Sequence, residues 1–265
     1  MKRNKIYAIV LWLVALALII AGCQDANAAG VGVYNATVCG PNAWVRVKQV
    51  TSEFTVHDGA TACITSERKH LDYQITQTST DHWQYPNISS GYEMGESSCA
   101  STADTCYRYP VRVKDDGAPV ASVRAWLAPG IYNLSFDVWF APDKTGMSYQ
   151  TRTDDTELMI WLAHPGIYDS CDYHTDIDHI DWCVLDGWAG GGSGKPWKRI
   201  TFEAPRTALG SVNVSKLWLN PFFRNAEAHA MLKADEWLYE IDLGNELYSG
   251  GLHDNIHYYS LTGVR

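Results

Sequence analysis

The sequence lacks several motifs that mark common classes of functional site. It contains no Cys-x-x-Cys pair, which makes a zinc site a weak interpretation. It has no Gly-x-Ser-x-Gly motif, which counts against a serine hydrolase. The stretch Gly190–Gly194 is followed by Lys-Pro and not by the Gly-Lys-Ser/Thr of a phosphate-binding loop, so we interpret it as a hairpin tip. No internal repeat or long linker is present either.

Positive charge is also scarce. The chain has 21 Lys and Arg against 30 Asp and Glu, which gives a formal net charge of -9. This balance argues against nucleic acid and anionic membrane surfaces as partners, and it leaves a neutral substrate open. Trp and Tyr are abundant, with 11 and 15 residues against 6 Phe, and such rings suit stacking on sugars as well as packing in a β core. Nothing in the sequence indicates a cofactor.

The apolar run at the N-terminus is too short to span a bilayer. Ile6–Ile20 comprises 15 residues, whereas a membrane-spanning helix needs roughly 20. Three basic residues precede the run: Lys2, Arg3 and Lys5. A basic start followed by a short apolar segment predicts an export signal.

The export signal ends in Ile20-Ala21-Gly22-Cys23, which resembles a bacterial lipobox. Residues 1–23 are therefore interpreted as a signal peptide whose Cys23 becomes lipidated, residues 24–38 as a short tether, and residues 39–265 as one folded domain. Cleavage after Ala26-Asn27-Ala28, with free secretion, is the alternative. We expect an exported monomer, held at a bacterial cell surface or secreted, that meets the membrane only through the lipid.

The cysteines other than Cys23 form an even set of six, which in an exported protein indicates disulfides. Six cysteines allow several connectivities. Sequence order favours three pairs that each close a local loop: Cys39–Cys63, Cys99–Cys106 and Cys171–Cys183.

Short stretches rich in Val, Ile, Tyr, Trp and Thr, separated by Gly, Pro, Asn and Asp, predict an all-β domain. The predicted strands are 43–50, 122–127, 132–140, 157–162, 199–203, 238–243 and 256–261. Their spacing favours a two-sheet β-sandwich or jelly roll. One segment, 214–232, is predicted to hold a single short helix that starts near Pro221 or is broken there.

Acids and large side chains share one face of the strand around Glu157. Side chains of a strand alternate between two faces, so Leu158, Ile160 and Leu162 form an apolar face. Glu157, Met159 and Trp161 form the other. An acid among large side chains is unusual for a solvent face and reasonable for a sugar-binding cleft.

The same division occurs in two further strands. Asp137 and Trp139 share a face in the segment 135–140, and Glu246 shares a face with Tyr248 further along the chain. Glycoside hydrolysis needs two carboxyl groups, one to protonate the leaving oxygen and one to attack or to activate water. The acids also fit a plainer interpretation as exposed residues of amphipathic strands.

Several segments in order resemble glycoside hydrolase family 12, the endo-β-1,4-glucanase and cellulase family. The stretch 155–161 (DTELMIW) is similar to its nucleophile strand, and 132–140 (YNLSFDVWF) to the strand before it. Trp237–Gly251 and the short element Tyr85–Ile88 also match in order and spacing. The resemblance is strong in 132–161 and 237–251 and weak over the first third.

This resemblance implies a two-sheet jelly roll with a long concave cleft. It also implies retaining cleavage of β-1,4-glucosidic bonds, with Glu157 as nucleophile and Glu246 as general acid/base. Asp137 would hydrogen-bond near the nucleophile, and Met159 would lie beneath the sugar at the cleavage point. A retaining pair should have carboxyl groups ~5–5.5 Å apart.

Substrate contacts are expected from Trp139, Trp161, Tyr248, Asn245 and Phe54. The family usually has Phe before the acid/base and Trp two residues after it, where this chain has Asn245 and Tyr248. The family's N-terminal Trp strand is not evident, and Phe54 is its nearest counterpart. The substrate preference is therefore open between cellulose-type glucan, xyloglucan and mixed-linkage β-glucan.

Three alternatives remain at this point. The acidic loop 171–183 has oxygen and imidazole ligands that suit a divalent ion, but we interpret it as a solvated, disulfide-linked hairpin over the edge of the cleft and expect no metal. Xylan is a further possible substrate. A non-catalytic carbohydrate-binding lipoprotein would keep the aromatic cleft but would have no need of two carboxylates.

Overall fold

The computed structural model describes fifteen stretches of the chain. These are residues 36–39, 44–48, 53–57, 63–67, 70–75, 87–93, 96–97, 110–115, 119–127, 129–143, 154–164, 170–190, 196–205, 210–249 and 252–262. The predicted signal peptide, the lipidation site Cys23 and most of the tether lie outside them, as do Cys99 and Cys106. In the described part of the chain, no helix has both the length and the apolar character needed to cross a bilayer.

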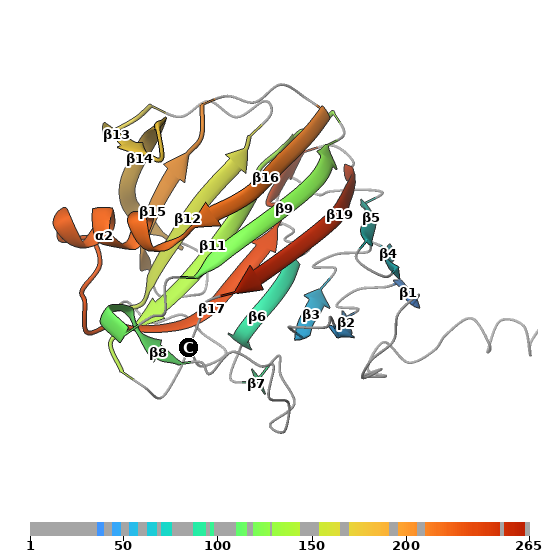
Figure 1. The fold of residues 1–265 in the computed structure, drawn as a ribbon, viewed down its shortest axis with the longest axis horizontal. Helices are drawn as coiled ribbons and strands as arrows, with labels where there is room; N and C mark the ends of the chain where they lie inside the picture. Colours follow the sequence, from blue (N-terminus) through green and yellow to red (C-terminus); the bar gives the residue numbers. More distant parts are fainter. Residues whose placement is uncertain are drawn as a thin grey trace, which may run out of the picture.

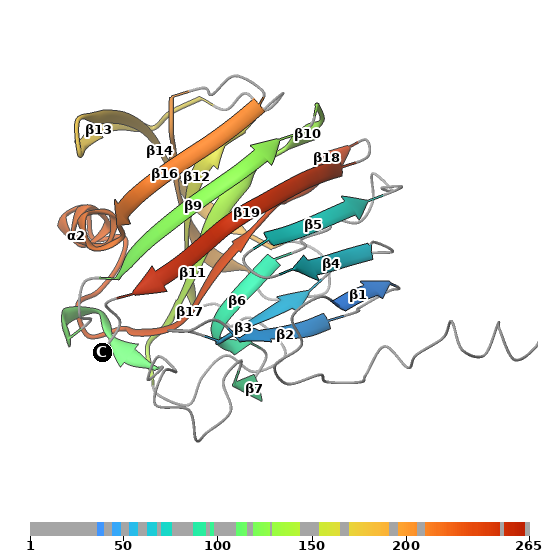
Figure 2. The same cartoon turned by 45° about the vertical axis from the view of Figure 1, so that its right-hand side comes forward.

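The described strands form two large sheets, which Figures 1 and 2 show as two layers. The smaller sheet has six strands in the order β1-β4-β5-β19-β9-β16. Their bounds are β1 Ala36–Cys39, β4 Cys63–Glu67, β5 His70–Ile75, β19 Leu252–Thr262, β9 Val120–Leu127 and β16 Gly210–Trp218.

The larger sheet has eleven strands and carries the acids. Its main order is β13-β14-β15-β12-β11-β17-β6-β3-β2, with β7 on β6 and β8 on β17. The strands at one end and the centre are β13 Tyr173–Ile177, β14 Ile180–Ala189, β15 Trp197–Glu203, β12 Thr156–Ala163, β11 Leu134–Ala141 and β17 Trp237–Gly244. The others are β6 Asn87–Glu93, β3 Glu53–His57, β2 Trp44–Lys48, β7 Glu96–Ser97 and β8 Val111–Arg112.

Shorter elements complete the fold. The 3-10 helix η1 spans Val113–Asp115, directly after β8. A two-stranded ladder joins β10, Ile131–Tyr132, to β18, Leu247–Ser249. This ladder matters for the site because Asn133 follows β10 and Glu246 precedes β18.

The core lies between the two sheets. Phe136 and Val138 of β11 and Leu158 and Ile160 of β12 are fully buried, in one cluster with Val123 of β9. Period-2 alternation sends every second residue of these strands into this layer. The other face of the larger sheet, here called the acidic face, holds Glu157, Met159 and Trp161 of β12 and Asp137 and Trp139 of β11. The two-sheet, all-β prediction is confirmed.

The single helix of the described residues, α2, spans Asn220–Ala228. The helix begins at Asn220, one residue before Pro221, which agrees with the predicted start near Pro221. Proline fits the first turn of a helix, where its missing N–H is no loss. Its buried residues Phe222 and Phe223 pack edge-on against Trp182, Phe202 and Phe140. Residues 214–218, which begin the segment 214–232 expected to hold the helix, continue strand β16.

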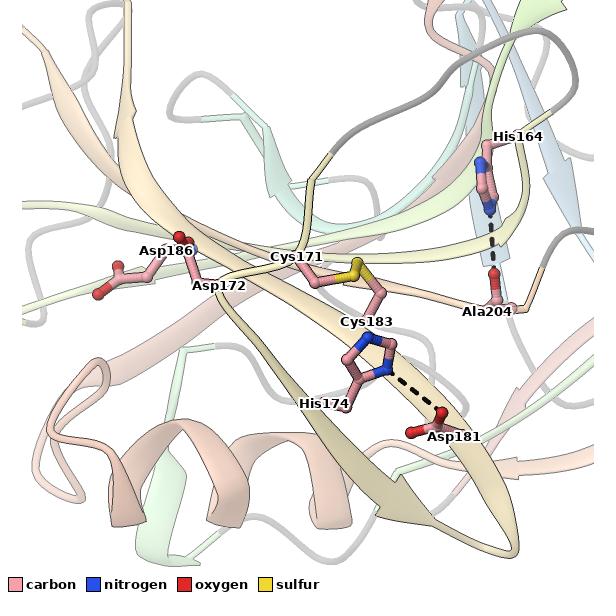
Figure 3. Close-up of a disulfide and its surroundings, with 8 residues drawn as sticks. All are labelled: His164, Cys171, Asp172, His174, Asp181, Cys183, Asp186 and Ala204. Atoms are coloured by element: carbon pink, nitrogen blue, oxygen red, sulfur yellow. Dashed lines mark hydrogen bonds and ion pairs between the residues drawn. A yellow bond between two sulfur atoms is a disulfide. The ribbon is translucent and has the colours of Figure 1, made fainter.

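The acidic loop 171–183 is a β-hairpin at the edge of the larger sheet (Figure 3). A disulfide joins Cys171 to Cys183, which confirms that predicted pair. Asp178 and His179 form the tip, with φ of 54° and 64°, as a tight two-residue turn requires. Tyr173 stacks on His229 and donates to Asn225 Oδ1 at 3.1 Å, which attaches the hairpin to α2.

The two other predicted disulfides stay predictions. Antiparallel pairing of β1 with β4 places Cys39 directly opposite Cys63. That register brings the two backbones together as the predicted bond requires, and the bond itself stays a prediction. Cys99–Cys106 lies outside the described residues.

Candidate active site

Glu157 lies on β12, in the centre of the larger sheet. Antiparallel β11 places Trp139 opposite it, and parallel β15 places Arg199 on its other side. The indole N–H of Trp197 donates to Glu157 Oε2 at 2.7 Å. The rings of Trp139 and Trp197 lie 5.7 Å apart, centroid to centroid, at an interplanar angle of 50°. The carboxyl group is therefore set among two indoles and one guanidinium.

This environment changes the ionisation of Glu157. The side chain is 5% exposed, and burial is the largest cause that raises its pKa from 4.5 to about 7. The negative charge of Glu246 raises the pKa further. The hydrogen bond from Trp197 and the charge of Arg199 act in the opposite direction, because both stabilise the carboxylate. Near neutral pH this carboxyl group is thus poised between its two forms.

Glu246 is half-buried in the connection between β17 and β18. Its Oε2 accepts a hydrogen bond of 2.6 Å from the side-chain amide of Asn133. Its backbone N–H donates to Asn133 Oδ1 at 3.0 Å, and its backbone oxygen accepts from Asn133 N at 3.1 Å. Because its charge acts on Glu157, the two acids form one electrostatically coupled pair. The predicted carboxyl separation stays a prediction.

The other residues expected to serve the pair lie on the same face. Asp137 is 4% exposed, stands opposite Met159 in the β11–β12 ladder and accepts a 2.7 Å hydrogen bond from Ser135 Oγ. Met159 is fully buried. Trp161 is 3% exposed, and its indole N–H has no hydrogen-bond partner among the described residues.

For three of the residues expected to contact substrate, the structure does not show a side chain on the acidic face. Asn245 is fully buried, and its amide donates to the backbone oxygen of Asn133 at 3.0 Å, so its side chain supports the chain near Glu246. Phe54 lies in β3 and Tyr248 in β18, but their side chains lie outside the described residues. Their predicted contacts stay predictions.

A comparison with protein-family models identifies the family of the chain that carries these two acids. The family model described as glycosyl hydrolase family 12 matches residues 50–262. The chain belongs to glycosyl hydrolase family 12. The match covers both coupled acids and every described strand of the larger sheet except β2, which makes the chain a glycoside hydrolase whose substrate class is a polysaccharide.

Solved family 12 structures share the fold. A xyloglucanase from Bacillus licheniformis, in complex with ligand, has a TM-score of 0.71 and 21% identity over 87% of this chain and 100% of its own. The cellulase and endo-1,4-β-glucanase CelB2 has a TM-score of 0.66 and 21% identity, with the same coverage. Endoglucanase Cel12A from Rhodothermus marinus has a TM-score of 0.64 and 23% identity over 86% of this chain and 98% of its own. No curated protein sequence matches the chain.

Sequence reasoning does not single out three residues that surround the acids. Asn133 lies in an Asn-x-Ser/Thr sequon, and Trp197 is one of 11 Trp residues that could stack on sugars or pack in the core. No local pattern distinguishes Arg199. The one sequence feature that could have identified Asn133 as a residue of the site is its position next to Tyr132 in the family-like segment 132–140.

The hairpin 171–183 does not assemble a metal site in the part of the chain that the structure describes. No group of three or more His, Cys, Asp or Glu side chains there is arranged to hold an ion. His174 Nδ1 lies 3.2 Å from Asp181 Oδ2 across the two strands, and Asp172 Oδ2 accepts from the backbone N–H of Asp186 (Figure 3). In these contacts the carboxyl groups of Asp172 and Asp181 bind other residues of the hairpin strands.

Proposed function

We propose that this family 12 hydrolase is a retaining endo-β-1,4-glucanase that acts on cellulose-type β-glucan. The observation that carries the proposal is the coupled pair, in which buried Glu157 has a pKa near 7 that is raised partly by the charge of Glu246. Two such carboxyl groups will carry one proton between them over a range of pH. Double displacement needs one protonated and one ionised carboxyl group.

The contacts of the pair support an assignment of roles. Trp197 and Arg199 both favour the ionised form of Glu157, which suits a nucleophile that attacks the anomeric carbon. Glu246 then gives its proton to the leaving oxygen as the glycosyl–Glu157 bond forms. In the second half, Glu246 takes a proton from water, the water oxygen bonds to the anomeric carbon, and Glu157 leaves as the carboxylate.

Aromatic side chains next to the acids support a sugar substrate. Trp139 is the cross-strand neighbour of Glu157, and Trp197 packs beside both. The N–H of Trp161, on the same face, is buried and has no partner among the described residues. A buried donor gains free energy when it is paired, which favours a polar ligand at that point.

The second candidate substrate is xyloglucan. The structure of the Bacillus licheniformis xyloglucanase superimposes on this chain with a TM-score of 0.71, above the 0.66 of CelB2 and the 0.64 of Cel12A. One experiment tests the remaining alternatives, which are mixed-linkage β-glucan or xylan as the substrate and a non-catalytic glucan-binding role.

The experiment is reducing-sugar release from carboxymethyl cellulose, barley β-glucan, xyloglucan and xylan. Glu157→Gln and Glu246→Gln are assayed beside the wild type, and product anomers are followed by NMR. Activity on a β-1,4-glucan, first release of the β-anomer, and loss of at least ~10³-fold in both variants are expected. Absence of activity on all four polymers with glucan binding intact would favour the binding role.

We further propose that the protein is exported and anchored through a lipid on Cys23. Support comes from the short apolar run and lipobox-like end of residues 1–23. Expression of the full chain with Cys23→Ser is expected to move the protein from the detergent phase of a Triton X-114 partition to the aqueous phase. Equal partition of both chains, with cleavage after Ala28, would favour the freely secreted form.

A further inference from the structure

Asn133 makes a two-point contact with Glu246 across 113 positions of sequence. Its side chain is fully buried. One end of its amide, Nδ2, donates to Glu246 Oε2 at 2.6 Å, and the other end, Oδ1, accepts from the backbone N–H of Glu246 at 3.0 Å. The backbone oxygen of Asn133 is held in turn by Asn245 Nδ2 at 3.0 Å.

These contacts fix which end of the Asn133 amide faces the carboxyl group. A backbone N–H can only donate, so the atom of Asn133 that meets it must be the oxygen. Ser135 Oγ, which donates to Asp137 Oδ1 at 2.7 Å, also lies 3.3 Å from Asn133 Oδ1. The nitrogen of Asn133 is therefore directed at Glu246 Oε2.

The direction of this hydrogen bond restricts the carboxyl group that accepts it. An amide nitrogen has two N–H donors and no acceptor, so Oε2 must accept in both ionisation states of Glu246. In a protonated carboxyl group the carbonyl oxygen is a better acceptor than the hydroxyl oxygen, so the bond favours Oε2 as the carbonyl oxygen. A proton on Glu246 is consequently placed on the other oxygen, Oε1. The same bond holds the side chain in one rotamer, which removes an entropic cost from the transfer step.

We propose that Asn133 is a positioning residue for the general acid/base of this hydrolase: it holds Glu246 in place and reserves Oε1 as the oxygen that gives and takes the proton. The proposal rests on the proposed role of Glu246. Asn133 acts through Glu246 and need not touch the sugar. The short β10–β18 ladder supports it, because it pairs the backbone directly before Asn133 with the backbone directly after Glu246.

The consequence is a dependence on the leaving group. A polysaccharide leaves as a poor leaving group and needs the proton, whereas a dinitrophenolate leaves without one. If Asn133 serves proton transfer, its loss should slow cleavage of cello-oligosaccharides far more than formation of the glycosyl-enzyme from a dinitrophenyl cellobioside. A residue with a merely structural role would slow both alike.

The test compares kcat/KM on both substrates for the wild type, Asn133→Asp and Asn133→Ala. Asn133→Asp keeps the size and the acceptor for the Glu246 N–H but removes the donor. We expect a loss of ~10²-fold or more on the oligosaccharide and a much smaller loss on the dinitrophenyl substrate. Asn225→Ala is the matched control, because it removes two side-chain hydrogen bonds at the hairpin and α2, and it should leave the ratio of the two activities unchanged.

Equal losses on both substrates, or no loss on either, would overturn the positioning role. If the wild type cleaves neither substrate, the proposed function itself is contradicted. Failure of the positioning role can therefore be distinguished from failure of the proposed function. If the Asn133 variants do not fold, as judged by circular dichroism, Asn245→Ala takes their place. That variant removes the hydrogen bond to the backbone of Asn133 and is expected to change the activity ratio in the same direction, by less.

Discussion

The indole N–H of Trp197 donates a hydrogen bond of 2.7 Å to Oε2 of Glu157, forty positions earlier in the chain. The bond joins two strands that run parallel, β12 and β15, within a sheet whose other described pairings are antiparallel. The N–H of Trp197 stabilises the ionised carboxylate of Glu157, so removal of this donor should raise the pKa of Glu157.

Trp197→Phe is expected to raise the pKa of Glu157 above about 7, because the aromatic ring stays while the donor is lost. Fewer molecules then carry an ionised nucleophile at pH 6, and the acidic limb of kcat/KM moves to higher pH. A charged hydrogen bond of about 1.5–3 kcal/mol predicts a loss of roughly 10–100-fold at pH 6. Trp188→Phe, at a side chain 64% exposed, is the control and should leave the profile unchanged. An unaltered acidic limb in Trp197→Phe would contradict the assignment.

Glu246→Gln is expected to lower the pKa of Glu157. The negative charge of Glu246 is one of the causes that raise this pKa to about 7, and the substitution removes it. Burial is the larger cause and persists, so the pKa should fall but stay above 4.5. Titration of carboxyl carbons by ¹³C NMR in protein labelled at Glu measures the shift. A pKa that does not move would show that the two groups are not coupled.

Glu236→Gln is expected to stabilise the fold at neutral pH. Burial is the largest cause that raises the pKa of Glu236 from 4.5 to about 7. Between these values the folded state binds more protons than the unfolded state, so stability falls as pH rises through this window. Below pH 4.5 both states are protonated and the penalty is absent.

The gain from Glu236→Gln at pH 8 should be about 1 kcal/mol, or an increase of ~2–4 °C in Tm, because solvent screening reduces the penalty that the raised pKa implies. Thermal unfolding at pH 4.5 and pH 8 measures it, with kcat/KM as a control for the active site. A gain of the same size at both pH values would point to packing and not to ionisation.

Replacement of Cys171 and Cys183 by Ser is expected to destabilise the protein without loss of catalysis. The disulfide closes a loop with a sequence separation of 12, for which chain entropy gives up to about 3 kcal/mol. The hairpin lies beyond β15, at the edge of the sheet, so the catalytic pair keeps its neighbours. Urea unfolding and reducing-sugar assays below the transition measure both effects. A loss of kcat in the folded variant would contradict this separation of stability from catalysis.

The shape of the acidic face was predictable from alternation alone. Glu157, Met159 and Trp161 lie on one side of β12 and Leu158, Ile160 and Leu162 on the other, because a strand has a fixed period of two. A single sequence holds no comparable rule for which distant strands become neighbours. The parallel pairing that brings Trp197 and Arg199 beside Glu157 is set by packing of whole layers, and it could not be inferred from local pattern.

Residues 214–218 lie in the segment predicted to hold the helix, and there is a local reason why their strand was not recognised. The β16–β9 register shifts between Val214 and Leu217, so the buried residues Val212 and Leu217 are separated by an odd number of positions. Such a bulge breaks the period-two pattern that identifies a strand. Pro221 then marked the helix start correctly, because its effect on the backbone does not depend on distant contacts.

The place of β19 has a consequence for when the protein can fold. This strand follows every other described strand in sequence, yet it lies inside the six-stranded sheet, between β5 and β9, and pairs with both. A chain that has been synthesised only as far as Ser249 cannot join β4 and β5 to β9, and both open edges stay exposed. Commitment to the native state is thus postponed until the whole sequence has emerged, which pulse proteolysis of nascent chains of increasing length would detect as a single late gain of resistance.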